Sequence, residues 1–257
     1  MYPVLFQVSD YIIYTYGAAM VLTFFVCLPP ILYFFPRNIL TYSDIYNFFL
    51  IIIVILFSSQ FISLLIMQSF NFTDAIAVFH LRGFGGFSSY PALIATFIAF
   101  YLYCRIYNIP YLRTLDFLFP YAILALAIQR IFGCFMASCC HGQPTELPWG
   151  VLFPDTSSAG KIFHQLAIHP TQLYYGITTF LIWVFLLTYK KRYKDSWNGE
   201  ITVMGLSLLS ITYFFITFLR GDITPYPTIT NLTSGQYAAI GIFILSVLIF
   251  TKKSSVK

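Results

Sequence analysis

Long, unbroken apolar runs follow one another along this chain, for example from Phe48 to Phe57, and short polar segments separate them. A helix needs about 20 apolar residues to cross a bilayer, whereas the strands of a membrane barrel alternate in polarity over about ten residues. The pattern therefore predicts an all-α polytopic membrane protein, with residues 1–257 in a single domain and seven transmembrane helices. The expected spans are Tyr11–Phe35, Asn47–Phe70, Ser89–Tyr107, Leu115–Ala137, Gln172–Tyr189, Ile201–Leu219 and Gln236–Thr251.

The composition agrees with this prediction and excludes other classes of protein. Hydrophobic residues make up 59% of the chain and charged residues only 9%, against about 25% charged residues in a soluble domain. So few charges cannot cover a water-soluble globule, and the apolar content is too high for a disordered chain. An ordinary cytosolic enzyme and a small disulfide-bonded scaffold are therefore excluded as well.

Basic residues predict how the spans are oriented. The segment between the fifth and sixth spans holds Lys190, Lys191, Arg192 and Lys194, and cytoplasmic loops of membrane proteins carry an excess of Lys and Arg. Counting spans from this loop places the N-terminus outside, in the periplasm, and the C-terminus inside, in the cytoplasm. Most of the 14 basic residues then lie inside, so the net charge of +5 reflects topology, and we expect no nucleic-acid partner.

The three stretches predicted to lie outside, over residues 70–88, 138–171 and 220–235, differ from the short inner loops. They hold all four histidines of the chain, together with several glycines and prolines. Loops with such residues on a rigid helical scaffold are where binding and catalytic groups concentrate. We therefore expect the functional site on the outer side.

Two arginines stand at the outer ends of expected spans. An arginine that faces lipid at mid-depth costs about 2.5–3.5 kcal/mol on insertion scales, so Arg130 is expected to face the bundle interior or to reach the interface. Arg220 can be an interfacial anchor paired with Asp222, and Arg130 can be a paired structural residue. The alternative is functional: two guanidinium groups at one depth match the oxygens of a phosphate headgroup.

Three of the five cysteines, Cys134, Cys139 and Cys140, lie close together beside His141. Their spacing differs from the paired C-x2-C pattern of zinc sites, so we expect no metal site. A disulfide on the oxidising side of the membrane and plain packing of small residues in a tight turn both remain open.

Several motifs in order along the chain resemble the prolipoprotein diacylglyceryl transferase family. The similar stretches are Tyr16-Gly17, Gly86–Tyr90, Arg130 through Gly142–Thr145, Pro148–Val151 with Phe153-Pro154, His169–Tyr174, Phe218–Asp222 and Leu232–Gln236. Each motif is short, but together they occur at matching places along a seven-span, N-out chain.

The resemblance implies an activity and a place in the cell. Members of this family transfer the diacylglyceryl group of phosphatidylglycerol to the lipobox cysteine thiol of a prolipoprotein, and this forms a thioether. The partners implied are phosphatidylglycerol, a prolipoprotein signal peptide and the lipid bilayer of the bacterial cytoplasmic (inner) membrane, with no cofactor. The implied catalytic residues are Tyr90, Arg130, His141 and Arg220, and the implied substrate-binding residues are Tyr16, Gly142, His169, Gln172, Tyr174 and Gln236.

The chain also departs from the family pattern. Tyr90 stands where the family commonly has histidine, so His141 is the preferred general base, with His80 as another candidate and packing as the alternative for His141. The family's Asn and Glu fall on Cys134 and Cys139, an Arg and a Glu of its sixth span fall on Tyr213 and Thr217, and Arg130 lies one residue further from Gly133. An enzyme acting on another phospholipid or thiol, and a non-catalytic lipid-binding or transport protein, therefore stay open.

Overall fold

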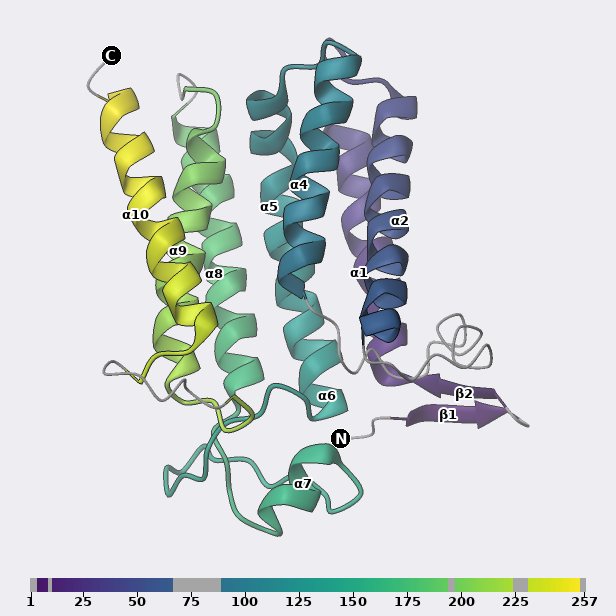
Figure 1. Cartoon of the computed structure of the whole chain (residues 1–257), viewed down its shortest axis with the longest axis vertical. Helices are drawn as coiled ribbons and strands as arrows, with labels where there is room; N and C mark the ends of the chain where they lie inside the picture. Colours follow the sequence, from purple (N-terminus) through teal and green to yellow (C-terminus); the bar gives the residue numbers. More distant parts are fainter. Residues whose placement is uncertain (1–3, 9–10, 67–88, 194–196, 224–230, 255–257) are drawn as a thin grey trace.

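A computed structural model describes the chain except for residues 1–3, 9–10, 67–88, 194–196, 224–230 and 255–257, and it shows a bundle of long helices (Figure 1). The elements are β1 (Val4–Val8), β2 (Tyr11–Tyr14), α1 (Thr15–Phe34), α2 (Tyr42–Ile66), α4 (Ser89–Ile106), α5 (Tyr111–Ile128), the π-helix η1 (Gln129–Cys134), α6 (Phe135–Ala137), α7 (Ser158–Phe163), α8 (Thr171–Arg192), α9 (Glu200–Thr217) and α10 (Ser234–Ser254).

Five of the described helices are long and apolar enough to cross a membrane. They are Thr15–Phe34, Tyr111–Ala137, Thr171–Arg192, Glu200–Thr217 and Ser234–Lys253, and α2 and α4 contribute the shorter apolar stretches Tyr42–Ile55 and Ala95–Ile106. Large apolar side chains such as Phe25 and Leu248 are 67% and 60% exposed on the outside of the bundle. Such surfaces are expected where lipid takes the place of water.

The expected first span is wrong at its start. Tyr11–Tyr14 forms strand β2, which pairs with β1 in an antiparallel hairpin before α1 begins at Thr15. The four residues Tyr-Ile-Ile-Tyr are aromatic or β-branched, and these types favour strands when a neighbouring strand is available. A window of apolar residues does not distinguish such a strand from a helix.

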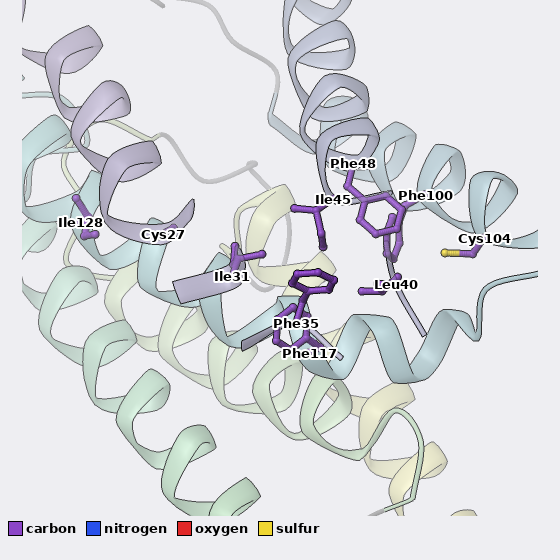
Figure 2. Close-up of a cluster of buried hydrophobic side chains, with 10 residues drawn as sticks. All are labelled: Cys27, Ile31, Phe35, Leu40, Ile45, Phe48, Phe100, Cys104, Phe117 and Ile128. Atoms are coloured by element: carbon purple, nitrogen blue, oxygen red, sulfur yellow. The ribbon is translucent and has the colours of Figure 1, made fainter. Parts of the chain in front are cut away.

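A cluster of buried apolar side chains joins the first four long helices. Ile31 and Phe35 at the end of α1 pack with Phe48 of α2, Phe100 of α4 and Phe117 of α5 (Figure 2). The rings of Phe48 and Phe100 meet edge to face at 4.6 Å between centroids, a favoured geometry for aromatic pairs. This cluster fixes α1, α2 and α4 against α5.

A second cluster joins α5 to the later helices. Phe119 and Ile123 of α5 pack with Leu186 of α8 and Ile201 of α9. A side chain at Gly205 of α9 would strike the ring of Phe119, so glycine is needed where these two helices approach. Because α5 belongs to both clusters, it positions whatever is attached to its C-terminal end.

The N-terminus of α9 is anchored on a buried carboxylate. Asp116 of α5 accepts hydrogen bonds from the backbone N–H of Gly199 (2.6 Å), from the backbone N–H of Thr202 (2.9 Å) and from the Thr202 hydroxyl (2.7 Å). A carboxylate suits this place, because the first N–H groups of a helix lack partners and carry partial positive charge.

The two ends of the bundle differ in character. One end of the bundle carries the hairpin and α7, and we call it the loop end (Figure 1). Helices α1, α8 and α10 begin there, and α6 and α9 end there. The opposite end carries the basic last turns of α8 and α10, with Lys190–Arg192 and Lys252-Lys253. Long loops and basic turns are thus separated along the bundle axis.

Candidate functional site

Three loops at the loop end are joined through their backbones. The N–H of Gly142 donates to the carbonyl of His169 (3.1 Å), and the N–H of Gly221 donates to the carbonyl of His141 (3.0 Å). Further backbone hydrogen bonds of Gln143 and His169 complete the pattern. In it, residues 141–143 lie between residues 167–169 on one side and residues 219–221 on the other. We call this three-stranded arrangement the loop ladder.

Glycine is required at two points of the loop ladder. A Cβ atom at Gly142 would strike the backbone of His169, and one at Gly221 would strike the backbone of Gly142. The three segments can therefore approach only with hydrogen at these positions. The predicted substrate-binding residue Gly142 thus lies in the frame of the site.

Arg130 lies on η1, at the point where α5 widens into a π-helix. Each turn of a π-helix holds an additional residue, and such turns often occur at functional sites. The predicted arginine lies on this π-helical turn and faces Tyr175 of α8.

The guanidinium of Arg130 lies over the ring of Tyr175, with 5.0 Å between the guanidinium carbon and the ring centroid. The Tyr175 hydroxyl is 3.0 Å from the hydroxyl of Thr217 and donates weakly to the carbonyl of Tyr213 (3.4 Å). No carboxylate of the described residues forms an ion pair with Arg130. Its charge is thus supported by an aromatic face and is available to an anion.

Arg220 follows the end of α9 and is buried. Its Nε and Nη2 donate to the two carboxylate oxygens of Asp222 at 2.9 and 2.6 Å, so the expected pairing with Asp222 is confirmed. Burial acts to lower the pKa of Arg220, but the hydrogen bonds to Asp222 and nearby negative groups outweigh it and raise the pKa above its usual value. The side chain therefore remains a fixed cation.

The three neighbouring cysteines meet in space although their spacing in sequence is irregular. The Sγ atoms of Cys134, Cys139 and Cys140 all lie within 4.8 Å of one another. The neighbouring Cys134 and Cys139 thiols and the charges of Arg130 and Arg220 together lower the pKa of Cys140, against the effect of burial. Arg130 Nη1 lies 3.9 Å from Sγ of Cys134, and Arg220 pairs with Gly142 two residues after Cys140, so both arginines lie beside the cysteine group.

Tyr16 brings α1 to this site. The Tyr16 phenol interacts electrostatically with Cys134, Cys139 and Arg130, and its ring would be in van der Waals contact with a Cβ at Gly133. The side chain that a Cβ at Gly133 would strike is that of Gln129. The structure places this predicted substrate-binding residue next to the predicted arginine.

His141 lies in the loop ladder and is buried. Its ring meets Phe163 of α7 edge to face at 5.2 Å, and its Nδ1 has no hydrogen-bond partner among the described residues. This packing agrees with the structural alternative for His141. Its role as a base stays a prediction.

Gln172 and Thr171 hold the cysteine turn in place. The Gln172 amide donates to the carbonyl of Cys139 (2.7 Å), and the Thr171 hydroxyl donates to the carbonyl of Cys140 (2.6 Å). Both side chains are fully buried. The described contacts therefore make Gln172 a residue that positions the turn.

His169 and Tyr174 form a small polar group with Trp149. The indole N–H of Trp149 donates to the hydroxyl of Tyr174 (2.8 Å), which lies 3.3 Å from Nδ1 of His169. Trp149 is 56% exposed. These two predicted substrate-binding residues are thus brought together near the surface of the loop end.

The Gln236 side chain forms its hydrogen bonds within the protein. Its Oε1 accepts from the backbone N–H of Thr233 (2.9 Å), and its Nε2 donates to the carbonyl of Phe214 (3.3 Å). These bonds cap α10 and tie it to α9. Tyr90 lies in the first turn of α4, but its side chain, like His80 and the loop 70–88, falls outside the described residues.

Tyr175 was missed by reasoning from the sequence. It follows directly after the His169–Tyr174 motif, and an aromatic residue in an apolar helix gives no signal of its own. The departures at Tyr213 and Thr217 were the available hint, because both positions contact the Tyr175 hydroxyl. A neutral network lies under Arg130 at the positions where the resemblance implied an Arg and a Glu.

Comparison with known proteins agrees with this arrangement. A family model described as prolipoprotein diacylglyceryl transferase matches residues 3–252. A phosphatidylglycerol–prolipoprotein diacylglyceryl transferase of Clostridium tetani is 31% identical over 250 residues, which is 97% of each chain. Proteins of the same description from Finegoldia magna and Clostridioides difficile are 34% identical over 175 residues (68% of this chain, 64% of the relative) and 36% identical over 145 residues (56% and 53%).

Proposed function

We propose that this chain, which belongs to the prolipoprotein diacylglyceryl transferase family, transfers the diacylglyceryl group of phosphatidylglycerol to the lipobox cysteine thiol of a prolipoprotein. The thiolate sulfur attacks the glyceryl carbon, the bond from that carbon to the phosphate oxygen breaks, and glycerol phosphate leaves with the electron pair. A thioether remains on the prolipoprotein. This is the first step of bacterial lipoprotein maturation.

The observation that carries this proposal is that Arg130 contacts the cysteine group at Cys134, while Arg220 pairs with Gly142 in the loop ladder, two residues after Cys140. Guanidinium groups match phosphate oxygens in geometry and charge. Arg130 offers a cation without a carboxylate partner among the described residues, and Asp222 holds the Arg220 guanidinium in one orientation. Fixed positive charge here stabilises the phosphate as it becomes the leaving group.

The remaining residues take supporting roles in the proposal. Tyr16 lies beside Arg130 and contacts the headgroup, and the group of His169, Tyr174 and Trp149 receives polar parts of the substrates near the surface.

A thiol with a pKa of about 8.5 must lose a proton before it attacks. His141 and Tyr90 are the candidate groups for that step.

Both substrates reside in the membrane, so the proposal includes its topology. We place seven spans in the bacterial cytoplasmic membrane, with the loop end outside and the basic end inside. The five helices that are long and apolar enough to cross a membrane supply five of these spans, and α2 and α4 supply the other two. Phosphatidylglycerol and the signal peptide then reach the loop end by lateral movement within the bilayer.

The test is reconstitution of the full chain with phosphatidylglycerol and a lipobox peptide. We expect a peptide product heavier by one diacylglyceryl group, equal release of glycerol phosphate, and rescue of a bacterium depleted of its own transferase. Product formation from a different phospholipid alone would assign the chain to another substrate. Phosphatidylglycerol binding without any product, in correctly folded protein, would make it a lipid-binding protein.

A further inference from the structure

The three thiols described above form a compact group with the dimensions of a metal site. A thiolate bond to a metal ion of about 2.3 Å in a three-coordinate site places the sulfurs about 4 Å apart. The Sγ atoms of Cys134, Cys139 and Cys140 lie within 4.8 Å of one another. Small side-chain rotations therefore suffice to bring all three onto one centre.

The backbone that carries these cysteines is held in place. Ser138 and Cys140 adopt left-handed conformations, with φ of 57° and 55°, and the N–H of Cys139 donates to the carbonyl of Cys134 (3.1 Å). Gln172 and Thr171 bind the carbonyls of Cys139 and Cys140 from the start of α8. A preorganised set of donors loses little conformational freedom on binding an ion.

The surroundings compensate the negative charge of thiolates. Arg130 and Arg220 both interact electrostatically with Cys140, and Nη1 of Arg130 lies 3.9 Å from Sγ of Cys134. Cys139 and Cys140 are only partly buried, so an ion can reach them. Three thiolates around a monovalent ion carry two net negative charges, which Arg130, without a carboxylate partner among the described residues, and Arg220, which also binds Asp222, partly offset.

We propose that Cys134, Cys139 and Cys140 form a three-coordinate thiolate site for Cu(I). Soft thiolate ligands select Cu(I), Zn(II) and related ions, and structural zinc sites take four ligands. Among the described residues, this group contains three cysteines and no histidine or carboxylate. Cu(I), which accepts three ligands, is therefore favoured over zinc. On binding, three copper–sulfur bonds form, the thiols release their protons to solvent, and no electron is transferred.

Titration of the reduced full-length chain in detergent, without oxygen, tests the proposal. Cu(I) is supplied from a chelator of known affinity, and we expect one ion per chain. Mass spectrometry after alkylation then reports on each cysteine. Bound Cu(I) is expected to protect Cys134, Cys139 and Cys140 of the unmodified protein, and to leave the alkylation of Cys27 and Cys104 unchanged because both belong to an apolar cluster outside the thiol group.

Variants provide the matched comparison. Replacement of any one of Cys134, Cys139 or Cys140 by Ser should weaken Cu(I) binding by about tenfold or more, whereas Cys27→Ser and Cys104→Ser should retain one tightly bound ion. The proposal is overturned if reduced wild-type protein binds no Cu(I) or shows no protection. It is equally overturned if Zn(II) binds the three thiols more tightly, or if the isolated chain holds these cysteines as a disulfide and does not bind Cu(I) after reduction.

Discussion

The Arg130 side chain lies where two requirements of a membrane protein conflict. Its charge is costly at the apolar boundary, yet no carboxylate of the described residues neutralises it. The Tyr175 ring and the Cys134 thiol supply weak, neutral support instead. Because these contacts leave the positive charge of Arg130 without a counter-ion among the described residues, Arg130 attracts an anionic substrate strongly.

The substitution Arg130→Lys tests this role. A lysine keeps the charge but cannot form two parallel hydrogen bonds to a phosphate, and the loss of one charge-assisted bond is worth about 1.5–3 kcal/mol. We expect kcat/KM for diacylglyceryl transfer to fall by about tenfold to a hundredfold. Arg113→Lys, on the same helix but exposed at the basic end, is the control and should leave kcat/KM unchanged. Wild-type kinetics in Arg130→Lys would contradict the phosphate contact.

At the scale of single residues, the sequence indicates the importance of charged residues better than that of neutral ones. Arg130 and Arg220 stand out because a cation in an apolar chain needs an explanation. Tyr175 does not stand out, because its importance arises from a contact with Arg130 across two helices. The meeting of the three cysteine thiols likewise depends on two left-handed residues, which spacing in sequence does not reveal.

At the scale of elements, the π-helix η1 determines how Arg130 faces the site. An α-helix advances about 100° per residue, so one extra residue would rotate everything beyond it away from its partners. η1 absorbs that residue locally. Hydropathy gave the correct span here but no sign of the π-helix, because both kinds of helix are equally apolar.

Deletion of a single residue tests the function of η1. Phe132 is 48% exposed on η1, and its removal should convert the segment to α-helix while α6 keeps its direction. We expect the Phe132 deletion to fold and to retain much of its transfer activity. Deletion of Leu126, which is similarly exposed on the regular part of α5, rotates the rest of the helix and should abolish rescue of transferase-depleted cells. Equal damage by both deletions would contradict this account.

The carboxylate of Asp116 is the second element-scale feature open to test. It binds two backbone N–H groups and one hydroxyl at the start of α9. Removal of a buried helix cap of this kind costs about 2 kcal/mol. Asp116→Ala should therefore lower the unfolding temperature of the detergent-purified chain by several degrees, whereas Asp155→Ala, at an exposed loop position, should not. An unchanged unfolding temperature in Asp116→Ala would show that the cap is dispensable.

At the scale of the whole molecule, the long loops and the basic last turns of α8 and α10 lie at opposite ends of the bundle (Figure 1). The apolar windows located the observed helices closely, for example Ser89–Tyr107 against α4. The exception at Tyr11–Tyr14 depends on pairing with β1, a contact between segments. The loop ladder could not be predicted either, because it consists of backbone hydrogen bonds between residues far apart in sequence.

The proposed orientation makes a prediction for the whole chain. With the basic end in the cytoplasm, green fluorescent protein fused after α10 should fluoresce, because it folds in the cytoplasm, and alkaline phosphatase fused there should be inactive. A fusion placed in the loop between α7 and α8 should show the opposite pattern. An active phosphatase at the C-terminus would reverse the topology.

The loop ladder has a consequence for how such a site can change over evolution. Its register is fixed by backbone hydrogen bonds, by two glycines, Gly142 and Gly221, and by one side-chain contact, from the Gln143 amide to the carbonyl of Arg220. Neighbouring positions outside these contacts can therefore exchange one polar residue for another while the arginines keep their placement. A frame that tolerates such exchange allows new ligand chemistry to arise beside an existing reaction before the old one is lost.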